Sequence, residues 1–208
     1  MELILVRHGR PEHIVDADGP ADPPLTDVGH RQARAAAGWL SAESIDAIYV
    51  SPMVRARETA APLERLLGME ATVHRGVREF DAEESSYIPV EIMRQDKATW
   101  EKFLSEESAT NYQPFYDEVI DALVEIAGAN RSRRVAVVCH GGVINMWASR
   151  TLGLGPSMFF QPEYTSINRF AVSSRGHESI LSLNEVSHLR GAPDLRVDAV
   201  MTPAPEAG

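Results

Sequence analysis

The sequence predicts an α/β fold of three layers, in which helices cover both faces of a mostly parallel central sheet of about six strands. Short β-rich runs alternate along the chain with longer runs of helical periodicity, and 208 residues are enough for one domain with a sizeable insertion. The composition, 44% hydrophobic and 24% charged, is typical of globular proteins. We therefore expect a single domain over residues 1–200 and a disordered tail over residues 201–208.

Six short runs rich in aliphatic and β-branched residues are the expected strands. They are Glu2–Val6, Ile45–Val50, Ala71–Val73, Arg134–Cys139, Ile167–Val172 and Ser179–Leu183. The first is an apolar run typical of a buried strand, yet it ends in Arg7, His8 and Gly9, which contribute nothing to a core. Such an ending predicts a strand that carries polar groups to a cleft.

Four helices are expected between these strands. Apolar residues mark the first three at helical spacing: Ala33, Ala36, Ala37 and Leu40; Met53, Ala56, Ala60, Leu63 and Leu67; and Tyr116, Val119, Ile120, Leu123 and Ala127. The first follows the turn-like run DPPLTDVG, and the third should end near Gly128. For the second, Ser51 suits the N-cap and Pro52 the first helical position. The fourth should start at Gly142.

The stretch between Phe80 and Arg134 contains no strand candidate. We therefore expect a helical insertion there, which forms a cap over the functional site. The cap is placed within about residues 80–130, with the inserted helices in residues 80–115.

Composition excludes several classes of function. The formal net charge of −10 argues against a general binder of nucleic acids or anionic membranes. No apolar run approaches the roughly 18–20 residues of a membrane span, and the run at Leu3–Val6 is too short for a signal peptide. The single cysteine, Cys139, excludes an internal disulfide and fits a reducing compartment, so we expect a cytoplasmic protein.

Three of the expected strands are followed by unusually polar residues. The runs are VRHG after the first strand, VSPMVRARET after the second and VCHGG after the fourth. Ligands of open α/β sheets bind beyond the carboxyl ends of the strands, so these side chains should meet. Two histidines and at least two arginines that converge with helix N-termini predict a phosphate site, because the guanidinium fork matches phosphate oxygens.

At these residues the sequence resembles the histidine phosphatase superfamily, also called phosphoglycerate mutase-like. The matching motifs occur in family order: LVRHG at 5–9, LTDVGHRQA at 25–33, SPMVRARET at 51–59 and HGG at 140–142. They cover most of the chain, from residue 3 to about 170. The resemblance implies the three-layer fold and a phosphatase that acts on a small phosphate monoester.

The resemblance also implies the roles of individual residues. His8 would be the nucleophile that forms a phosphohistidine, and Arg7, Arg55 and His140 would hold the transferring phosphoryl group. On this alignment Arg55 is preferred to Arg57. Glu79, in GVREF, would protonate the leaving oxygen. These roles require a neutral His8, whose pKa nearby cations lower, and a Glu79 whose pKa is raised.

Further phosphate contacts are assigned to Gly141, Thr26 and Arg10. Family members carry an asparagine a few residues after their RHG, whereas this chain continues Arg10-Pro-Glu-His-Ile. Arg10 or His13 would take the place of that asparagine, or both would be exposed loop residues. The acidic run Asp81–Glu84 would either be solvated surface or line the rim of the pocket.

Two other kinds of site are disfavoured. Cys139 and His140 are consecutive in a strand and point to opposite faces, so a thiol–imidazole dyad is not expected. The seven histidines form no HExxH, HxH or Cys/His cluster, so we expect no metal and no cofactor. His13, His30, His74, His177 and His188 are expected at the surface or in structural roles.

Three alternatives to a small-molecule phosphatase stay open. One is a phosphatase of phosphohistidine proteins, and another is a mutase of the phosphoglycerate type, although the chain lacks the NERHYG-type run of that branch. The third is a catalytically silent binder of phosphorylated ligands. The sequence identifies neither the physiological substrate nor the oligomeric state, and it predicts no nucleic-acid or membrane partner.

Overall fold

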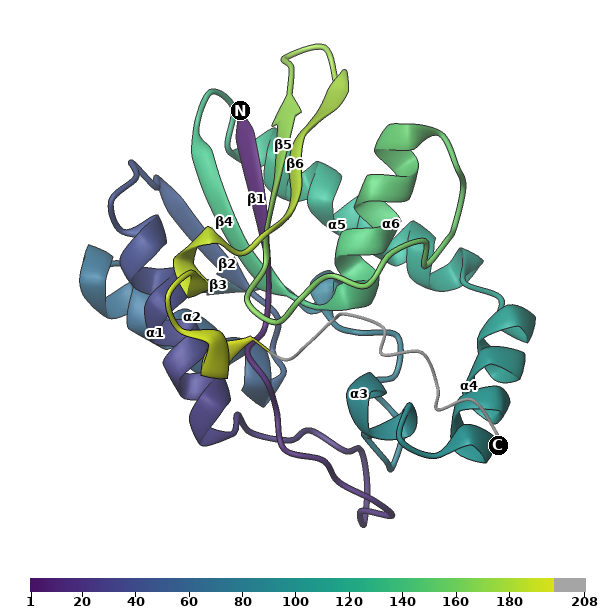
Figure 1. Ribbon diagram of the computed structural model, residues 1–208. Coiled ribbons are helices and arrows are strands. Elements are labelled where there is room, and N and C mark those ends of the chain that lie inside the picture. The colour runs from purple at the N-terminus through teal and green to yellow at the C-terminus, as the bar shows by residue number, and fades with distance from the viewer. Residues whose placement is uncertain (197–208) are drawn as a thin grey trace.

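The computed structural model describes residues 1–196, and these residues build one six-stranded sheet with helices on both faces (Figure 1). The strands are β1 (Glu2–Arg7), β2 (Ala47–Val50), β3 (Thr72–Val73), β4 (Arg134–Cys139), β5 (Ile167–Val172) and β6 (Glu178–Glu185). All six expected strands are present, with small shifts at their ends. The expected tail at 201–208 lies outside the described residues.

The sheet has the strand order β3-β2-β4-β1-β5-β6. The first four strands in this order run parallel, whereas β5 pairs antiparallel with β1 and β6 pairs antiparallel with β5. The expected mostly parallel sheet is confirmed. Strands β1 and β4 lie side by side in the centre, so the residues that follow Arg7 and Cys139 leave the sheet next to each other.

Alternating residues of the central strands face two separate cores. On one face Leu3 and Leu5 pack against α5 (Gln113–Ala129) and α6 (Gly141–Leu152). On the other face Ile4 and Val6 pack against α1 (Asp27–Leu40) and α2 (Val54–Leu67). The period of two along a strand thus produces the three-layer arrangement.

The start of α2 differs from the sequence prediction. Its N-cap is Met53, without a side-chain hydrogen bond, and not Ser51. The Ser51 N–H donates to the carbonyl of Val138 at 3.0 Å, so the chain is still paired with β4 there and turns into the helix later. The Val54 N–H instead donates to the carboxylate of Asp22, at 3.0 Å from each oxygen.

The expected insertion is shorter than residues 80–130. Helices α3 (Val90–Met93) and α4 (Lys97–Ala109) lie beside the carboxyl ends of the parallel strands (Figure 1). Helix α5, in contrast, buries Val119, Leu123 and Ile126 in the core of the sheet. The C-terminal boundary of the prediction is therefore wrong, because α5 belongs to the layers of the domain.

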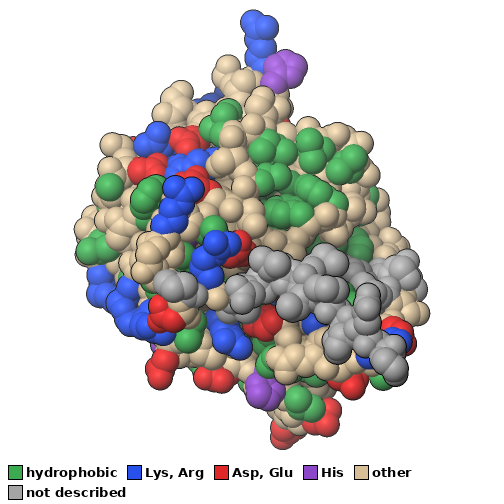
Figure 2. Space-filling model, viewed as in Figure 1, with side chains coloured by type: hydrophobic (Ala, Val, Ile, Leu, Met, Phe, Trp, Pro, Cys, Tyr) green, Lys and Arg blue, Asp and Glu red, His purple; other side chains and the backbone are tan. Residues whose placement is uncertain are grey.

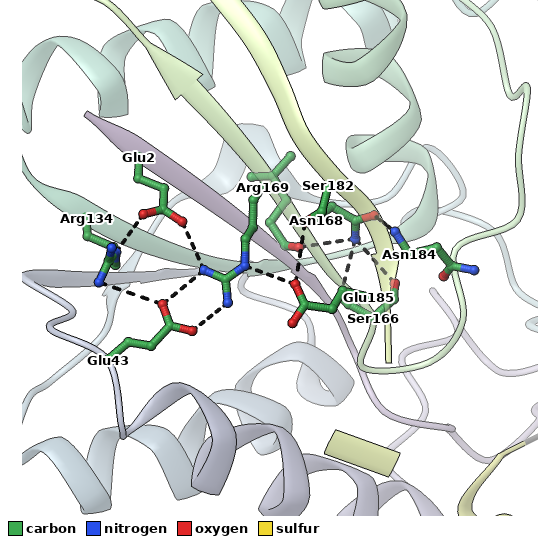
Figure 3. A network of polar contacts seen from close by, with 10 residues as sticks. Glu2, Glu43, Arg134, Ser166, Asn168, Arg169, Ser182, Asn184 and Glu185 are labelled. Carbon is green, nitrogen blue, oxygen red and sulfur yellow. Dashed lines mark hydrogen bonds and ion pairs between the residues drawn. The ribbon is translucent and has the colours of Figure 1, made fainter. Parts of the chain in front are cut away.

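A network of ion pairs joins four strands at the edge of the α1/α2 layer (Figure 3). Arg169 of β5 contacts Glu2 of β1 at 2.9 Å and Glu185 of β6 at 3.1 Å, and it also pairs with Glu43 in the loop before β2. Arg134 of β4 contacts Glu2 at 2.7 Å. The network fastens the antiparallel strands β5 and β6 to the parallel part of the sheet.

The surface carries charges of both signs. On the face shown in Figure 2, lysine and arginine side chains are interspersed with aspartate and glutamate. Of the helices in residues 1–196, none combines the length and the apolar character needed to cross a bilayer.

Candidate active site

The site forms where β1, β2 and β4 end. His8 follows β1 and His140 follows β4, and the centroids of their two rings are 5.2 Å apart. Arg7 is the last residue of β1, and Arg55 lies in the first turn of α2, which follows β2. Parallel pairing thus brings together the four side chains that the sequence predicts at this edge.

The imidazole of His8 is buried and its tautomer is defined. Nδ1 lies 2.7 Å from the carbonyl oxygen of Gly9, which only accepts hydrogen bonds, so Nδ1 carries the proton and donates. The lone pair is then on Nε2. Burial, together with the charges of Arg55 and Arg7, holds the pKa of His8 well below its usual range. The ring is therefore neutral at neutral pH and able to attack an electrophile.

Arg55 is a fully buried cation with unfilled hydrogen-bonding capacity. None of its three guanidinium nitrogens has a hydrogen-bond partner within residues 1–196. The carboxylates of Asp22 and Asp81 lie 3.7 and 3.6 Å away, which is beyond hydrogen-bond distance, and the Tyr87 ring centroid is 4.6 Å from the guanidinium. A buried donor without an acceptor is costly, so this arrangement is suited to binding an anion.

Arg7 is the second buried guanidinium of the site. Its Nη1 donates to the carbonyl of Pro162, and its guanidinium carbon lies 4.2 Å from the centroid of the Tyr164 ring. Its buried Nε has no partner among the described residues. The side chain is thus anchored at one end and still has a donor to offer.

His140 and Ser51 form a pair that the sequence did not predict. His140 Nε2 lies 2.8 Å from Ser51 Oγ, and the buried Nδ1 has no hydrogen-bond partner in the described part of the chain. Burial and then the charge of Arg55 lower the pKa of His140 well below its usual range. Ser51 follows β2 directly, and this position could have indicated a site residue, whereas the sequence pattern predicts a helix cap.

Glu79 follows the short 3-10 helix η1 (Arg75–Val77) and reaches α6. Its Oε2 accepts from the Gly142 N–H at 2.9 Å, and its Oε1 accepts from the Phe80 N–H at 3.1 Å. Burial, and then the charge of Asp81, raises the pKa of Glu79 to about 7. The carboxyl group can therefore donate or accept a proton near neutral pH.

Gly142 has to be a glycine for this contact to exist. A Cβ at this position would lie 2.1 Å from Glu79 Oε1 and 3.0 Å from the terminal carbon of Met158. Any side chain would displace the carboxyl group from the first turn of α6. Steric hindrance with Glu79 therefore explains why the second position after His140 is a glycine.

Two predicted phosphate contacts do not lie in the cavity. The Thr26 hydroxyl caps α1 by accepting from the Gly29 N–H at 3.0 Å, and it donates to the carbonyl of Arg10 at 3.0 Å. The Arg10 side chain pairs with Glu91 at 3.5 Å, and His13 is exposed. These residues hold the loop after β1 against α1, because both hydrogen-bonding roles of the Thr26 hydroxyl are already used.

The acidic run after Glu79 divides between the cavity and the surface. Asp81 lines the cavity, where burial raises its pKa although the charge of Arg55 lowers it. Glu83 pairs with Arg78 at the surface at 2.8 Å, and Glu84 is exposed. The prediction of a pocket contact is therefore correct for Asp81, and that of solvated surface is correct for Glu83 and Glu84.

These groups face a cavity of about 350 Å³. Its inner end is defined by the buried side chains of Arg7, His8 and Arg55, and Glu79 and Gly141 also line the cavity. Aromatic and aliphatic side chains form much of the rest of its wall. His140 is not among the residues that line the cavity. It contacts the ring of His8, which does line it.

Metal ligation and thiol chemistry are the two kinds of site that the sequence disfavours. No group of three or more histidine, cysteine or carboxylate side chains in residues 1–196 is arranged to hold a metal ion. Cys139 is fully buried in the core on the α5/α6 face, and burial raises the pKa of its thiol far above the usual range. It does not form a dyad with His140, whose ring contacts Ser51.

Comparison with known proteins extends these observations. The model of the histidine phosphatase superfamily (branch 1) matches residues 3–186. Phosphoserine phosphatase 1 of Hydrogenobacter thermophilus is 28% identical over 200 residues, which cover 91% of this chain and 94% of that protein. Phosphoglycerate mutase-like protein 4 of Arabidopsis thaliana is 29% identical over 202 residues, which cover 90% and 86%.

Two solved structures are similar to this chain in fold. A phosphoserine phosphatase from Entamoeba histolytica, in complex with 3-phosphoglyceric acid, superposes with a TM-score of 0.71 at 26% identity, over 90% of this chain and 98% of that chain. A mycobacterial glucosyl-3-phosphoglycerate phosphatase also gives a TM-score of 0.71, at 20% identity over 89% and 99% of the two chains, which supports the fold.

Proposed function

We propose a mechanism for this chain, which belongs to the histidine phosphatase superfamily (branch 1) and is a phosphoric monoester hydrolase. The substrate is a small phosphate monoester, and hydrolysis proceeds without a metal through a phosphohistidine on His8. The observation that carries this proposal is Arg55, a fully buried guanidinium whose three nitrogens lack hydrogen-bond partners among the described residues. A phosphoryl group at the inner end of the cavity would satisfy them.

In the first step His8 Nε2 attacks the phosphorus atom and the bond to the leaving oxygen breaks. Glu79 transfers its proton to that oxygen, so the alcohol leaves uncharged. The hydrogen bond from His8 Nδ1 to the Gly9 carbonyl keeps the ring oriented throughout. The pKa of about 7 means that a large fraction of Glu79 holds the required proton at neutral pH.

In the second step water attacks the phosphohistidine. Glu79, now a carboxylate, accepts a proton from the water, the P–N bond breaks, and His8 returns to its neutral state while inorganic phosphate leaves. The same carboxyl group thus acts as acid and then as base, and covalent catalysis divides one difficult displacement into two easier ones.

Charge stabilisation is the main contribution of the remaining residues. Arg7 and Arg55 hold the phosphoryl oxygens, and Gly141 adds the N-terminal end of α6. His140 acts through its contact with the His8 ring. At about 4 Å and an effective dielectric constant near 20, one arginine–phosphate contact contributes roughly 4 kcal/mol. Phosphoryl transfer depends on such stabilisation of the phosphoryl oxygens more than on other covalent chemistry.

We also propose a cytoplasmic protein whose partner is its small substrate and not a nucleic acid or a membrane. The net charge of −10 and the mixed charges on the face in Figure 2 support the absence of a polyanionic partner. The single, unpaired Cys139 supports a reducing compartment.

The test is hydrolysis of p-nitrophenyl phosphate in excess EDTA by the wild type, His8→Ala and the control His177→Ala, which changes an exposed histidine near the β5–β6 turn. We expect EDTA-insensitive turnover in the wild type and the control, and a loss of at least about a thousandfold in His8→Ala. Rapid acid-free quenching with ³²P-labelled substrate should trap a base-stable, acid-labile label on the wild type alone.

Four results would contradict the proposal. Full activity in His8→Ala would exclude the nucleophile, and inactivation by EDTA would exclude metal independence. Phosphoryl transfer that requires a bisphosphorylated cofactor would identify a mutase. Binding of phosphate esters without turnover in the wild type would identify a silent binder.

A further inference from the structure

We propose that the cavity selects phosphate monoesters whose alcohol carries an apolar ring, a specificity that rests on the proposed phosphatase function. The inner end of the cavity is cationic and holds the phosphoryl group. The outer wall, which contacts the alcohol, is built largely from aromatic side chains. A substrate that fits both parts of the cavity has a phosphoryl group at one end and an apolar ring at the other.

The aromatic wall comes from three separate segments of the chain. Phe80 follows Glu79, Trp100 and Phe103 lie on α4, and Phe159 lies in the loop between α6 and β5. The Trp100 and Phe103 rings are stacked, with centroids 5.3 Å apart and planes inclined by 20°. The Phe80 ring meets that of Tyr112 edge-on at 5.5 Å. Such flat and edge-on surfaces are suited to packing against another ring.

Part of this wall is exposed to solvent without a substrate. Phe80 is 48% exposed and Phe159 is 39% exposed, although both line a cavity. Core packing alone would have covered these rings. An apolar group that enters the cavity would remove their surface from water, which is the favourable term in binding. The binding energy of such a remote group can also support the chemical step.

Two of the polar side chains that line the cavity, Asn145 and Arg94, are already engaged within the protein. The amide of Asn145 is already committed, because Nδ2 donates to the carbonyls of Gly141 and Phe160 and Oδ1 accepts from the Phe160 N–H. Arg94 lies with its guanidinium carbon 4.8 Å from the Trp100 ring centroid, on the exposed side of the cavity. Its stacked position supports the aromatic wall, and binding of a substrate carboxylate at Arg94 is the competing outcome.

The test compares three alkyl esters, so that all leaving groups are alkoxides and chemical reactivity differs little. The substrates are 2-phenylethyl phosphate, ethyl phosphate and O-phosphoserine. In the wild type we expect kcat/KM for 2-phenylethyl phosphate to exceed that for each of the other two esters by at least about tenfold, as hydrophobic pockets discriminate by such factors.

The variants are Trp100→Ala, Phe103→Ala and the control Trp39→Ala, which removes an exposed tryptophan of α1 outside the cavity. The readout is the ratio of kcat/KM for 2-phenylethyl phosphate to that for ethyl phosphate within each protein. This ratio does not depend on the fraction of active enzyme. It should fall severalfold in both cavity variants and stay unchanged in the control.

Two outcomes would overturn this inference while leaving the phosphatase function intact. One is a ratio near one in the wild type, or a ratio that neither cavity variant lowers, with hydrolysis still dependent on His8. The other is a preference for O-phosphoserine that is lost in Arg94→Ala. Absence of His8-dependent hydrolysis of any ester, p-nitrophenyl phosphate included, would instead overturn the phosphatase function and this specificity with it.

Discussion

Replacing Arg55 by methionine should separate stability from function. The substitution keeps a flexible, unbranched side chain, shorter than arginine, and removes a buried cation whose three nitrogens have no hydrogen-bond partner in the described chain. The folded protein already bears the desolvation of this group, and the nearest carboxylate oxygens, of Asp22 and Asp81, lie 3.7 and 3.6 Å away. Removal of one partner is costly when it leaves a buried charge behind, but the side chains of Asp22 and Asp81 are 35% and 24% exposed, so both carboxylates stay partly hydrated.

The magnitudes follow from the same geometry. A phosphate contact with Arg55 contributes roughly 4 kcal/mol, and 1.4 kcal/mol corresponds to a factor of ten, so kcat/KM should fall about a thousandfold. The free energy of unfolding without ligand should change by no more than about 1 kcal/mol, or rise. Asp22 keeps its contact with the Val54 N–H, so the start of α2 does not depend on Arg55.

Two assays check this prediction. Urea unfolding measures the stability without ligand, and the shift in unfolding temperature with inorganic phosphate measures binding to the folded state. Arg57→Met is the matched control, because Arg57 lies two residues further on the same helix and is exposed. A loss of more than about 3 kcal/mol in Arg55→Met, together with an undiminished phosphate shift, would refute the reasoning.

Three further predictions concern the acid, the histidine pair and the ion-pair network. Because the first step needs protonated Glu79, kcat/KM of the wild type should decrease as the pH rises through about 7. Glu79→Gln should abolish this limb and lower kcat/KM for alkyl esters by about 10²–10⁴-fold. A persistent limb in the pH profile of kcat/KM would exclude Glu79 as the acid. Ser51→Ala should lower kcat about tenfold, because one hydrogen bond to His140 Nε2 is lost. The free energy of unfolding, measured in urea, should change by no more than about 1 kcal/mol. Ser51→Thr keeps the hydroxyl and should restore part of the rate. Arg169→Leu should lower the free energy of unfolding by about 1.5–3 kcal/mol, because the partly buried carboxylates of Glu2, Glu43 and Glu185 lose their common partner. Urea unfolding of this variant and the wild type measures the difference. A difference below about 0.5 kcal/mol would show that the network contributes little.

The strands, the three layers and the proximity of the two histidines could be predicted from the sequence. Periods of two and of 3.6 are local properties, so the six strands and the four helices on the sheet could be predicted from neighbouring residues. The carboxyl ends of parallel strands share one edge, so polar residues after β1, β2 and β4 had to meet there. His8, His140 and Arg55 were predicted for this reason together with the family motifs.

The surroundings of these groups depend on contacts between distant parts of the chain and could not be predicted. Ser51 contacts His140 across 89 positions of sequence, and no local pattern encodes that distance. Thr26 and Arg10 were assigned to the phosphate from their motif positions, but their contacts with each other and with Glu91 keep them out of the cavity. The pKa of Glu79 depends on burial and on the charge of Asp81, both of which exist only once the chain is packed. Local periodicity specifies elements, whereas electrostatic environment and cavity shape arise from contacts between residues far apart in the chain.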